Sequence, residues 1–199
     1  MKSVTDHFSS TALTVILLLT GVVSILAYDY IIDVNRSLPD YMMIDLVFAK
    51  NIDKAQEIVA TWGTNPMSTG KAHMVIGVNY LLSLTYPVFF FLTCHILAEQ
   101  NKHYPVVFKT GRVIGWIVPI AGIVDAYENI PLTMLVNGSD NALLPTLTYL
   151  SGTIKYSLIV IAVFYCIISL LIMMYEKIRW RRHPQPRRTI SHKPDKYAS

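Results

Sequence analysis

Val124-Asp125-Ala126-Tyr127-Glu128-Asn129-Ile130 places two acids and an amide inside an apolar run that extends over residues 113–136. A run of this length can cross a bilayer as a helix, which takes about 20 residues. Asp125, Glu128 and Asn129 are spaced i, i+3, i+4, so a helix presents all three on one face. A carboxylate in hydrocarbon costs at least ~2–3 kcal/mol and needs a partner or a water-filled cavity. The stretch therefore predicts a buried polar site within a membrane-spanning helix.

Four long apolar runs account for most of the hydrophobic residues of the chain. Hydrophobic residues make up 53% of the 199 residues and charged residues 15%, whereas about 25% are charged in a typical soluble domain. The runs lack the periodic pattern of a soluble core, so we predict an all-α, four-helix transmembrane bundle. The predicted spans are residues 11–32, 73–97, 113–136 and 146–175. They form one membrane domain, residues 1–183, and a basic tail, residues 184–199, that we expect to be disordered and cytoplasmic.

The segment between the first two runs carries helix signals of its own. Pro39 and Asp40 are placed to start a short helix, Asn51 or Asp53 to cap a second one, and Gly63 to end it. The apolar residues of the second helix share one face, namely Ile52, Ala55, Ile58, Val59 and Trp62. Few basic residues are available to hold anionic lipid, so we expect this helical cap, residues 39–63, to pack on the mouth of the bundle.

The Lys and Arg residues outside the runs are distributed unevenly between the two sides of the membrane. With four spans, both termini share a side with the loop between the second and third runs, and that side carries 12 Lys and Arg residues. The other side carries 4, and the remaining one, Lys155, lies within the fourth run. Because cytoplasmic segments are enriched in Lys and Arg, we predict that both termini are cytoplasmic and the cap extracytoplasmic.

The polar residues of the four runs are predicted to meet at one depth. Glu128 lies ~12 Å from the outer end of its run and Lys155 ~13–14 Å from the outer end of the antiparallel fourth run. Asn79 and Ser83 reach a similar zone, at ~9 and ~15 Å, while the inner half of each run is nearly all apolar. Asp29 approaches from the first run, although its position near the lipid–water interface favours simple hydration. The predicted polar centre comprises Asp125, Glu128, Asn129, Lys155, Asn79, Ser83, Tyr156 and Asp29.

Three functions are compatible with this polar centre. In the first, the chain is a structural subunit of a membrane complex, and Lys155 facing Asp125 and Glu128 only fixes helix register, with the excess negative charge absorbed by a shared proton or by Tyr156. In the second, the centre binds a small polar molecule or a lipid head group, as the tyrosines at its rim and the cap suggest. In the third, the chain is a membrane-embedded enzyme that uses Glu128 or Asp125 as acid or base beside Lys155.

The sequence argues against several other classes of protein. The runs hold no pair of histidines at helical spacing, and two carboxylates with an asparagine are a sparse set of metal ligands. No phosphate-cradling glycine loop, nucleophile elbow or nucleic-acid motif occurs. Cys94 and Cys166 lie in apolar runs and indicate core packing rather than a disulfide. We expect no metal, cofactor or nucleic acid; the expected partners are membrane lipid, which the basic tail contacts, and a small or lipid-like ligand, while an oligomer stays open.

Four motifs, in the same order, resemble a family of small bacterial four-helix integral membrane proteins. They are Asp45-Leu46-Val47-Phe48-Ala49, a helix from Lys54 that ends in Trp62-Gly63, a glycine followed by Asp125-x-x-Glu128-Asn129, and Lys155-Tyr156. The resemblance covers roughly residues 45–166 and implies the same architecture, a bacterial inner membrane and this choice of polar residues, but no activity. The chain departs from the family pattern at Asn79, where the family has an aspartate, and so carries one buried acid fewer.

The predicted orientation can be tested with reporters. A reporter that is active only in the cytoplasm should work when fused after Ser199 and fail when inserted near Thr64, because the charge bias places these points on opposite sides. A reporter that is active only outside the cytoplasm should give the opposite pattern at both points. Cytoplasmic activity near Thr64 would invert the orientation.

Overall fold

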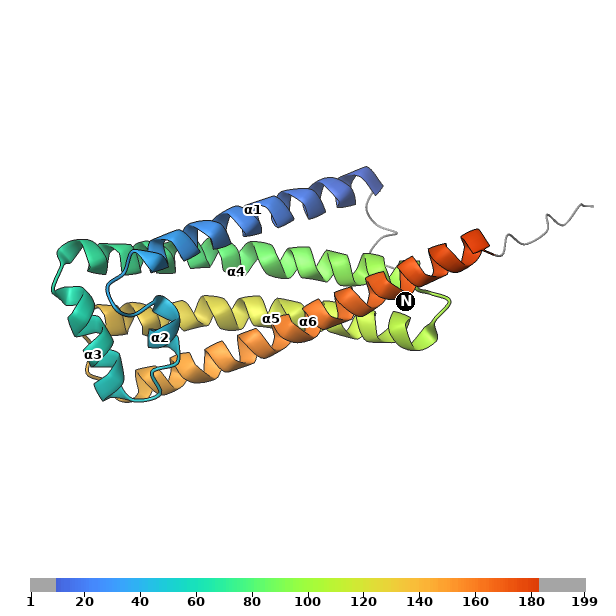
Figure 1. The fold of residues 1–199 in the computed structure, drawn as a ribbon. Coiled ribbons are helices and arrows are strands. Elements are labelled where there is room, and N and C mark those ends of the chain that lie inside the picture. The colour runs from blue at the N-terminus through green and yellow to red at the C-terminus, as the bar shows by residue number, and fades with distance from the viewer. Residues whose placement is uncertain (1–9, 183–199) are drawn as a thin grey trace, which may run out of the picture.

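The computed structural model describes residues 10–182, and all its regular elements in that range are helices (Figure 1). In chain order they are α1 (Ser10–Arg36), α2 (Met43–Val47), α3 (Ile52–Gly63), α4 (Pro66–Gln100), α5 (Pro105–Val136) and α6 (Leu143–Arg182). The four long helices confirm the predicted all-α bundle, and α2 and α3 form the predicted helical segment between the first two of them. The predicted disordered tail, residues 184–199, lies outside the described residues.

The four long helices are long and apolar enough to cross a membrane, which makes the chain a multi-pass membrane protein. Each extends beyond the span predicted from hydrophobicity, because an apolar run ends where polar residues begin, whereas a helix continues until its backbone is capped. In α4 this cap is Asn65, whose side chain accepts a hydrogen bond of 2.9 Å from the Met67 amide. Pro66 follows at the first helical position, where its missing N–H costs nothing.

Helix α4 lies between α1 and α5, and α6 packs mainly on α5, so that α1 and α6 are the outer helices of the bundle (Figure 1). Helices α4 and α5 approach closely at Gly122, where a Cβ atom would lie 2.6 Å from the Ser83 carbonyl oxygen. Pro87, four residues after Ser83, lacks the N–H that would bind this carbonyl within α4. The contact therefore needs a glycine, because any side chain at this position would push the two backbones apart.

Helices α2 and α3 form the cap, residues 39–63, which covers one end of the bundle (Figure 1). Asn51 caps α3 as predicted, accepting a hydrogen bond of 2.9 Å from the Lys54 amide. Helix α2 begins at Met43 rather than at Pro39 or Asp40, because Asp40 has a φ of 59°, outside the right-handed helical region. The cap therefore consists of two short helices joined by a turn.

The apolar face of the cap is buried against the long helices. Trp62 and Ile58 have no exposed surface, and both belong to one apolar cluster with residues of α4, α5 and α6. The Trp62 indole N–H donates to the Tyr41 carbonyl at 3.1 Å, so its only polar atom is satisfied. The prediction that this face packs on the bundle is confirmed, although Ile52 and Val59 are only partly buried.

The outer face of the cap is held by a polar cluster of Tyr41, Lys54 and Glu57. The Lys54 ammonium lies 2.8 Å from the Glu57 carboxylate and 2.9 Å from the Tyr41 hydroxyl, which itself donates to Glu57. These hydrogen bonds lower the pKa of the Glu57 carboxyl and raise that of Lys54. The cluster is exposed and links α3 to the loop before α2, but water screening makes its contribution to stability small.

Trp62→Ala should lower the free energy of unfolding by roughly 3–5 kcal/mol, because it opens a cavity in the cluster that joins cap and bundle. The matched control is Gln56→Ala, an exposed position of the same helix, which should leave stability nearly unchanged. Melting temperature in detergent measures both. An unchanged melting temperature for Trp62→Ala would show that the cap is not needed for the stability of the bundle.

Candidate functional site

Three charged side chains meet in the interior of the bundle. The Lys155 ammonium on α6 donates to Asp125 Oδ1 at 2.8 Å and to Glu128 Oε1 at 2.9 Å, both on α5. The side chains are 7%, 2% and 1% exposed, respectively, so water does not screen the charges. The three formal charges sum to one negative charge. The group is therefore a buried ion triad with one acid in excess.

An amide joins the ion triad to a third helix. Asn79 on α4 donates from Nδ2 to Asp125 Oδ1 at 2.9 Å and to Asn129 Oδ1 at 3.0 Å. Asp125 Oδ1 thus accepts hydrogen bonds from both Asn79 and Lys155. The structure brings together five of the eight residues that the sequence indicates, and they come from α4, α5 and α6. We call these five residues the polar centre: Asn79, Asp125, Glu128, Asn129 and Lys155.

The other three indicated residues lie outside this hydrogen-bond network. The Ser83 hydroxyl donates to the Tyr80 carbonyl of its own helix at 2.8 Å, at the close contact between α4 and α5. Asp29 is exposed on α1, which agrees with simple hydration at an interface. Tyr156 is 40% exposed beside the polar centre, with the Lys155 ammonium 5.0 Å from its ring centroid.

Two atoms of the polar centre are buried without a hydrogen-bond partner. They are Glu128 Oε2, an acceptor, and Asn129 Nδ2, a donor. The Lys155 ammonium has three N–H donors, of which two are used by the carboxylates. A buried polar group without a partner costs about 1–3 kcal/mol. The polar centre therefore retains one acceptor and two donors that a further molecule can satisfy.

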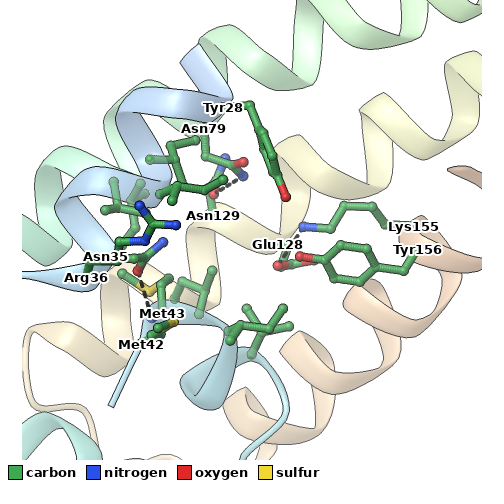
Figure 2. Close-up of a pocket in the computed structure, with 17 residues that line it drawn as sticks. Tyr28, Asn35, Arg36, Met42, Met43, Asn79, Glu128, Asn129, Lys155 and Tyr156 are labelled. Carbon is green, nitrogen blue, oxygen red and sulfur yellow. Dashed lines mark hydrogen bonds and ion pairs between the residues drawn. The ribbon is translucent and has the colours of Figure 1, made fainter. Parts of the chain in front are cut away.

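A cleft of about 480 Å³ adjoins the polar centre, and Glu128, Asn129, Asn79 and Lys155 form part of its lining. Its walls are mainly apolar side chains from α1, α2, α4 and α5. These are Ile31, Ile32, Met42, Met43, Ile44, Val47, Val75, Ile76 and Leu132. Tyr28 of α1 and Tyr156 of α6 stand at its rim, and Figure 2 shows their hydroxyl groups pointing toward the Lys155–Glu128 pair. The cleft lies between the two outer helices, with charged groups at its base.

Helix α2 forms one wall of the cleft and is anchored on both sides. The Met43 amide donates to the Asn35 side chain at the end of α1 at 2.9 Å. Phe48, at the other end of α2, stacks on the Tyr156 ring with centroids 5.9 Å apart and a 30° interplanar angle. Helix α2 was not predicted from the sequence to be part of the site; the only signal was the resemblance motif that begins at Asp45.

The half of the bundle remote from the cap is less apolar than predicted. His95, Asn101 and Ser169 are at most 3% exposed, and each has a buried polar atom without a partner. The His95 ring bonds to the Phe91 carbonyl of α4 at 2.8 Å, and the Asn101 amide donates to the Leu97 carbonyl at 2.9 Å and to the Ser169 carbonyl of α6 at 3.4 Å. His95 lies near the inner end of its apolar run, where an interfacial position is expected, and single polar residues such as Asn101 and Ser169 give no pattern in the sequence.

The chain was compared with protein-family models, with curated proteins and with solved structures, and none of them matches it. The resemblance to the bacterial four-helix family therefore stays an expectation from four motifs. Within residues 10–182, no three His, Cys, Asp or Glu side chains are grouped so as to hold a metal ion.

The number of unpaired charges that each variant leaves in the ion triad predicts how strongly it reduces stability. Glu128→Gln leaves Lys155 paired with Asp125 and should reduce stability least. Lys155→Met strands two carboxylates and should cost most, roughly 3–5 kcal/mol or more, since that is the usual cost of stranding one buried charge. The triple variant Asp125→Asn, Glu128→Gln, Lys155→Met carries no charge there and should regain much of the loss. Folded yield in membranes and melting temperature in detergent measure the series.

Ser157→Ala is the control for this series, because Ser157 is exposed on α6 two residues from Lys155 and bonds only to its own helix. It should behave like the unaltered chain. A triple variant no more stable than Lys155→Met would contradict the ion triad as the main polar contact between α5 and α6.

Proposed function

We propose that this membrane protein binds an amphipathic, lipid-like ligand in the cleft. The polar group of the ligand contacts the polar centre, and its apolar part lies along the walls formed by α1, α2 and α4. The observation that carries the proposal is the buried Glu128 carboxylate, which has one oxygen in an ion pair and the other without a partner, in the lining of a largely apolar cleft.

A purely structural role explains less of this geometry. A buried ion pair contributes to stability only when its remaining polar atoms are also satisfied, and here Glu128 Oε2 and Asn129 Nδ2 are not. Small-molecule sites typically combine a concave apolar lining with a few polar groups that fix orientation. The cleft has this composition, so binding accounts both for the unpaired atoms and for the apolar walls.

The position of the cleft between outer helices favours a ligand that arrives from the bilayer. Tyr28 and Tyr156, one from each outer helix, are 58% and 40% exposed at its rim. Tyr28 is close to the outer end of the first predicted span, where lipid tails meet head groups, and Tyr156 lies deeper, beside Lys155. A lipid can therefore enter with its chains still in the membrane and only its polar group displaced toward Lys155 and Glu128.

Orientation and membrane type are part of the same proposal. The charge bias supports cytoplasmic termini in a bacterial inner membrane, which places the cap and the cleft toward the extracytoplasmic leaflet. The ligand is then drawn from that leaflet, and membrane lipid is the expected partner of the chain.

A tryptophan in the cleft should block ligand binding. Ile32 of α1 is half-buried in the wall of the cleft, and a larger ring there occupies the space of the ligand. Ile32→Trp should therefore reduce labelling of cleft residues by a lipid with a photoreactive acyl chain at least several-fold. Labelled peptides from protein in lipid nanodiscs are measured by mass spectrometry.

Ile25→Trp is the matched control, because Ile25 lies on the same helix, is 69% exposed and is not part of the cleft. It should leave labelling of the cleft unchanged. Equal labelling in the two variants, or none in the unaltered chain, would contradict ligand binding. Recovery of the lipid in a chemically changed form would instead favour the catalytic alternative.

A further inference from the structure

We infer that the cleft selects uncharged lipids whose polar group is a free hydroxyl, such as diacylglycerols, over lipids that carry a phosphate. The inference rests on the proposed function and specifies the head group. Two independent features of the polar centre support it, namely its net charge and the hydrogen-bonding groups that it leaves unpaired.

The net charge argues against an anionic head group. Asp125 and Glu128 contribute two negative charges and Lys155 one positive charge, all at most 7% exposed. Charges interact strongly in such a dry site, so a phosphate beside Glu128 meets a net repulsion. Arg36, a second cation that lines the cleft, has a side chain 71% exposed and lies 3.9 Å from Asp33. Its charge is largely screened by water and does not offset that repulsion.

The unpaired groups match a hydroxyl. Glu128 Oε2 needs a donor, while Asn129 Nδ2 and the remaining Lys155 N–H need an acceptor. A hydroxyl supplies one donor and two acceptor lone pairs, so it offers both kinds of partner that the polar centre lacks. An ester or ether oxygen only accepts and leaves Glu128 Oε2 unpaired. An ammonium only donates and leaves the Asn129 amide unpaired.

The size and walls of the cleft fit the rest of such a molecule. The volume of about 480 Å³ is in the range of small-molecule pockets and admits a glycerol backbone with the first part of its chains. Ile32, Met43 and Val47 offer apolar contacts along the cleft. The remainder of each chain then extends between α1 and α6 into the bilayer. The polar group is thus the part of the ligand that meets the ion triad.

The test is competition against the photoreactive lipid in nanodiscs that contain the unaltered chain. Three competitors share the same two acyl chains: a diacylglycerol, the same molecule with its hydroxyl acetylated, and the corresponding phosphatidate. The diacylglycerol should halve labelling of the cleft at a mole fraction at least ten-fold lower than either of the others. Equal potency of the acetylated form would overturn the hydroxyl requirement, and equal potency of phosphatidate would overturn the charge argument.

A pair of variants at Gly152 tests the same contact from the side of the protein. A Cβ atom at this position would lie 3.7 Å from Glu128 Oε2 and 2.6 Å from Val47 Cγ1. Gly152→Ala and Gly152→Ser therefore displace Val47 alike, but only the serine places a hydroxyl beside the unpaired oxygen. In Gly152→Ser the ten-fold preference for the diacylglycerol should fall to nearly one, whereas Gly152→Ala should retain that preference. A preference that survives in both variants, or is lost in both, would show that Glu128 Oε2 is not the partner of the hydroxyl.

Failure of lipid binding and failure of head-group selectivity give different experimental results. If all three lipids reduce photolabelling of the cleft equally, the cleft binds lipid but does not select its head group. Absence of cleft labelling in the unaltered chain would remove both. The lipid series uses only the unaltered chain, so its result does not depend on whether the Gly152 variants fold.

Discussion

The interaction on which the structure depends is the contact of one buried ammonium with two buried carboxylates. In a bilayer none of these groups is tolerable alone, so Lys155 requires that the face of α5 bearing Asp125 and Glu128 turns toward α6. The i, i+3 spacing lets both acids reach one nitrogen, at 2.8 and 2.9 Å. Asn79 extends the same constraint to α4 through Asp125. One set of polar contacts thus fixes the rotation of three helices in a medium that offers no general hydrophobic force between them.

The depth of the polar groups and the facing of Lys155 toward Asp125 and Glu128 could be predicted from the sequence, whereas the hydrogen-bond partner of Ser83 could not. A rise of 1.5 Å per residue converts position into depth, which is why Lys155, Glu128 and Asn79 were expected at one level and are hydrogen-bonded there through Asp125 and Asn129. Ser83 was expected at that level too, but its hydroxyl bonds to its own backbone at 2.8 Å. The cap was predictable because Asn51, Trp62 and Gly63 are local signals. The cleft was not, because it depends on the distance between α1 and α6, which no local pattern encodes.

The acid in excess distinguishes a binding site from an ion pair that only fixes helix register. A site that only fixes helix register needs no more acids than bases. Apolar residues would also suffice, because they often replace buried ion pairs without loss of stability. Here Glu128 keeps one oxygen unpaired, which costs about 1–3 kcal/mol when no ligand is present. Function commonly accounts for such local costs, and the adjoining apolar cleft supplies the space for a molecule that relieves this one.

The cap contacts residues that lie beside the polar centre, so the state of one affects the other. Val47 of α2 packs against Gly152, beside Glu128, and Phe48 stacks on Tyr156 at the rim of the cleft. A ligand that contacts Val47 and Tyr156 therefore binds better when α2 is docked on the long helices. By thermodynamic linkage, the same ligand stabilises the docked cap. Helix α1 packs mainly on α4 and contacts the α2 region through the short loop, the hydrogen bond between Asn35 and Met43, and the packing of Ile31 and Val34 on the apolar cluster that includes residues of α2. Because α1 supplies none of the hydrogen bonds of the ion triad, we propose that a lipid enters the cleft on the side formed by α1.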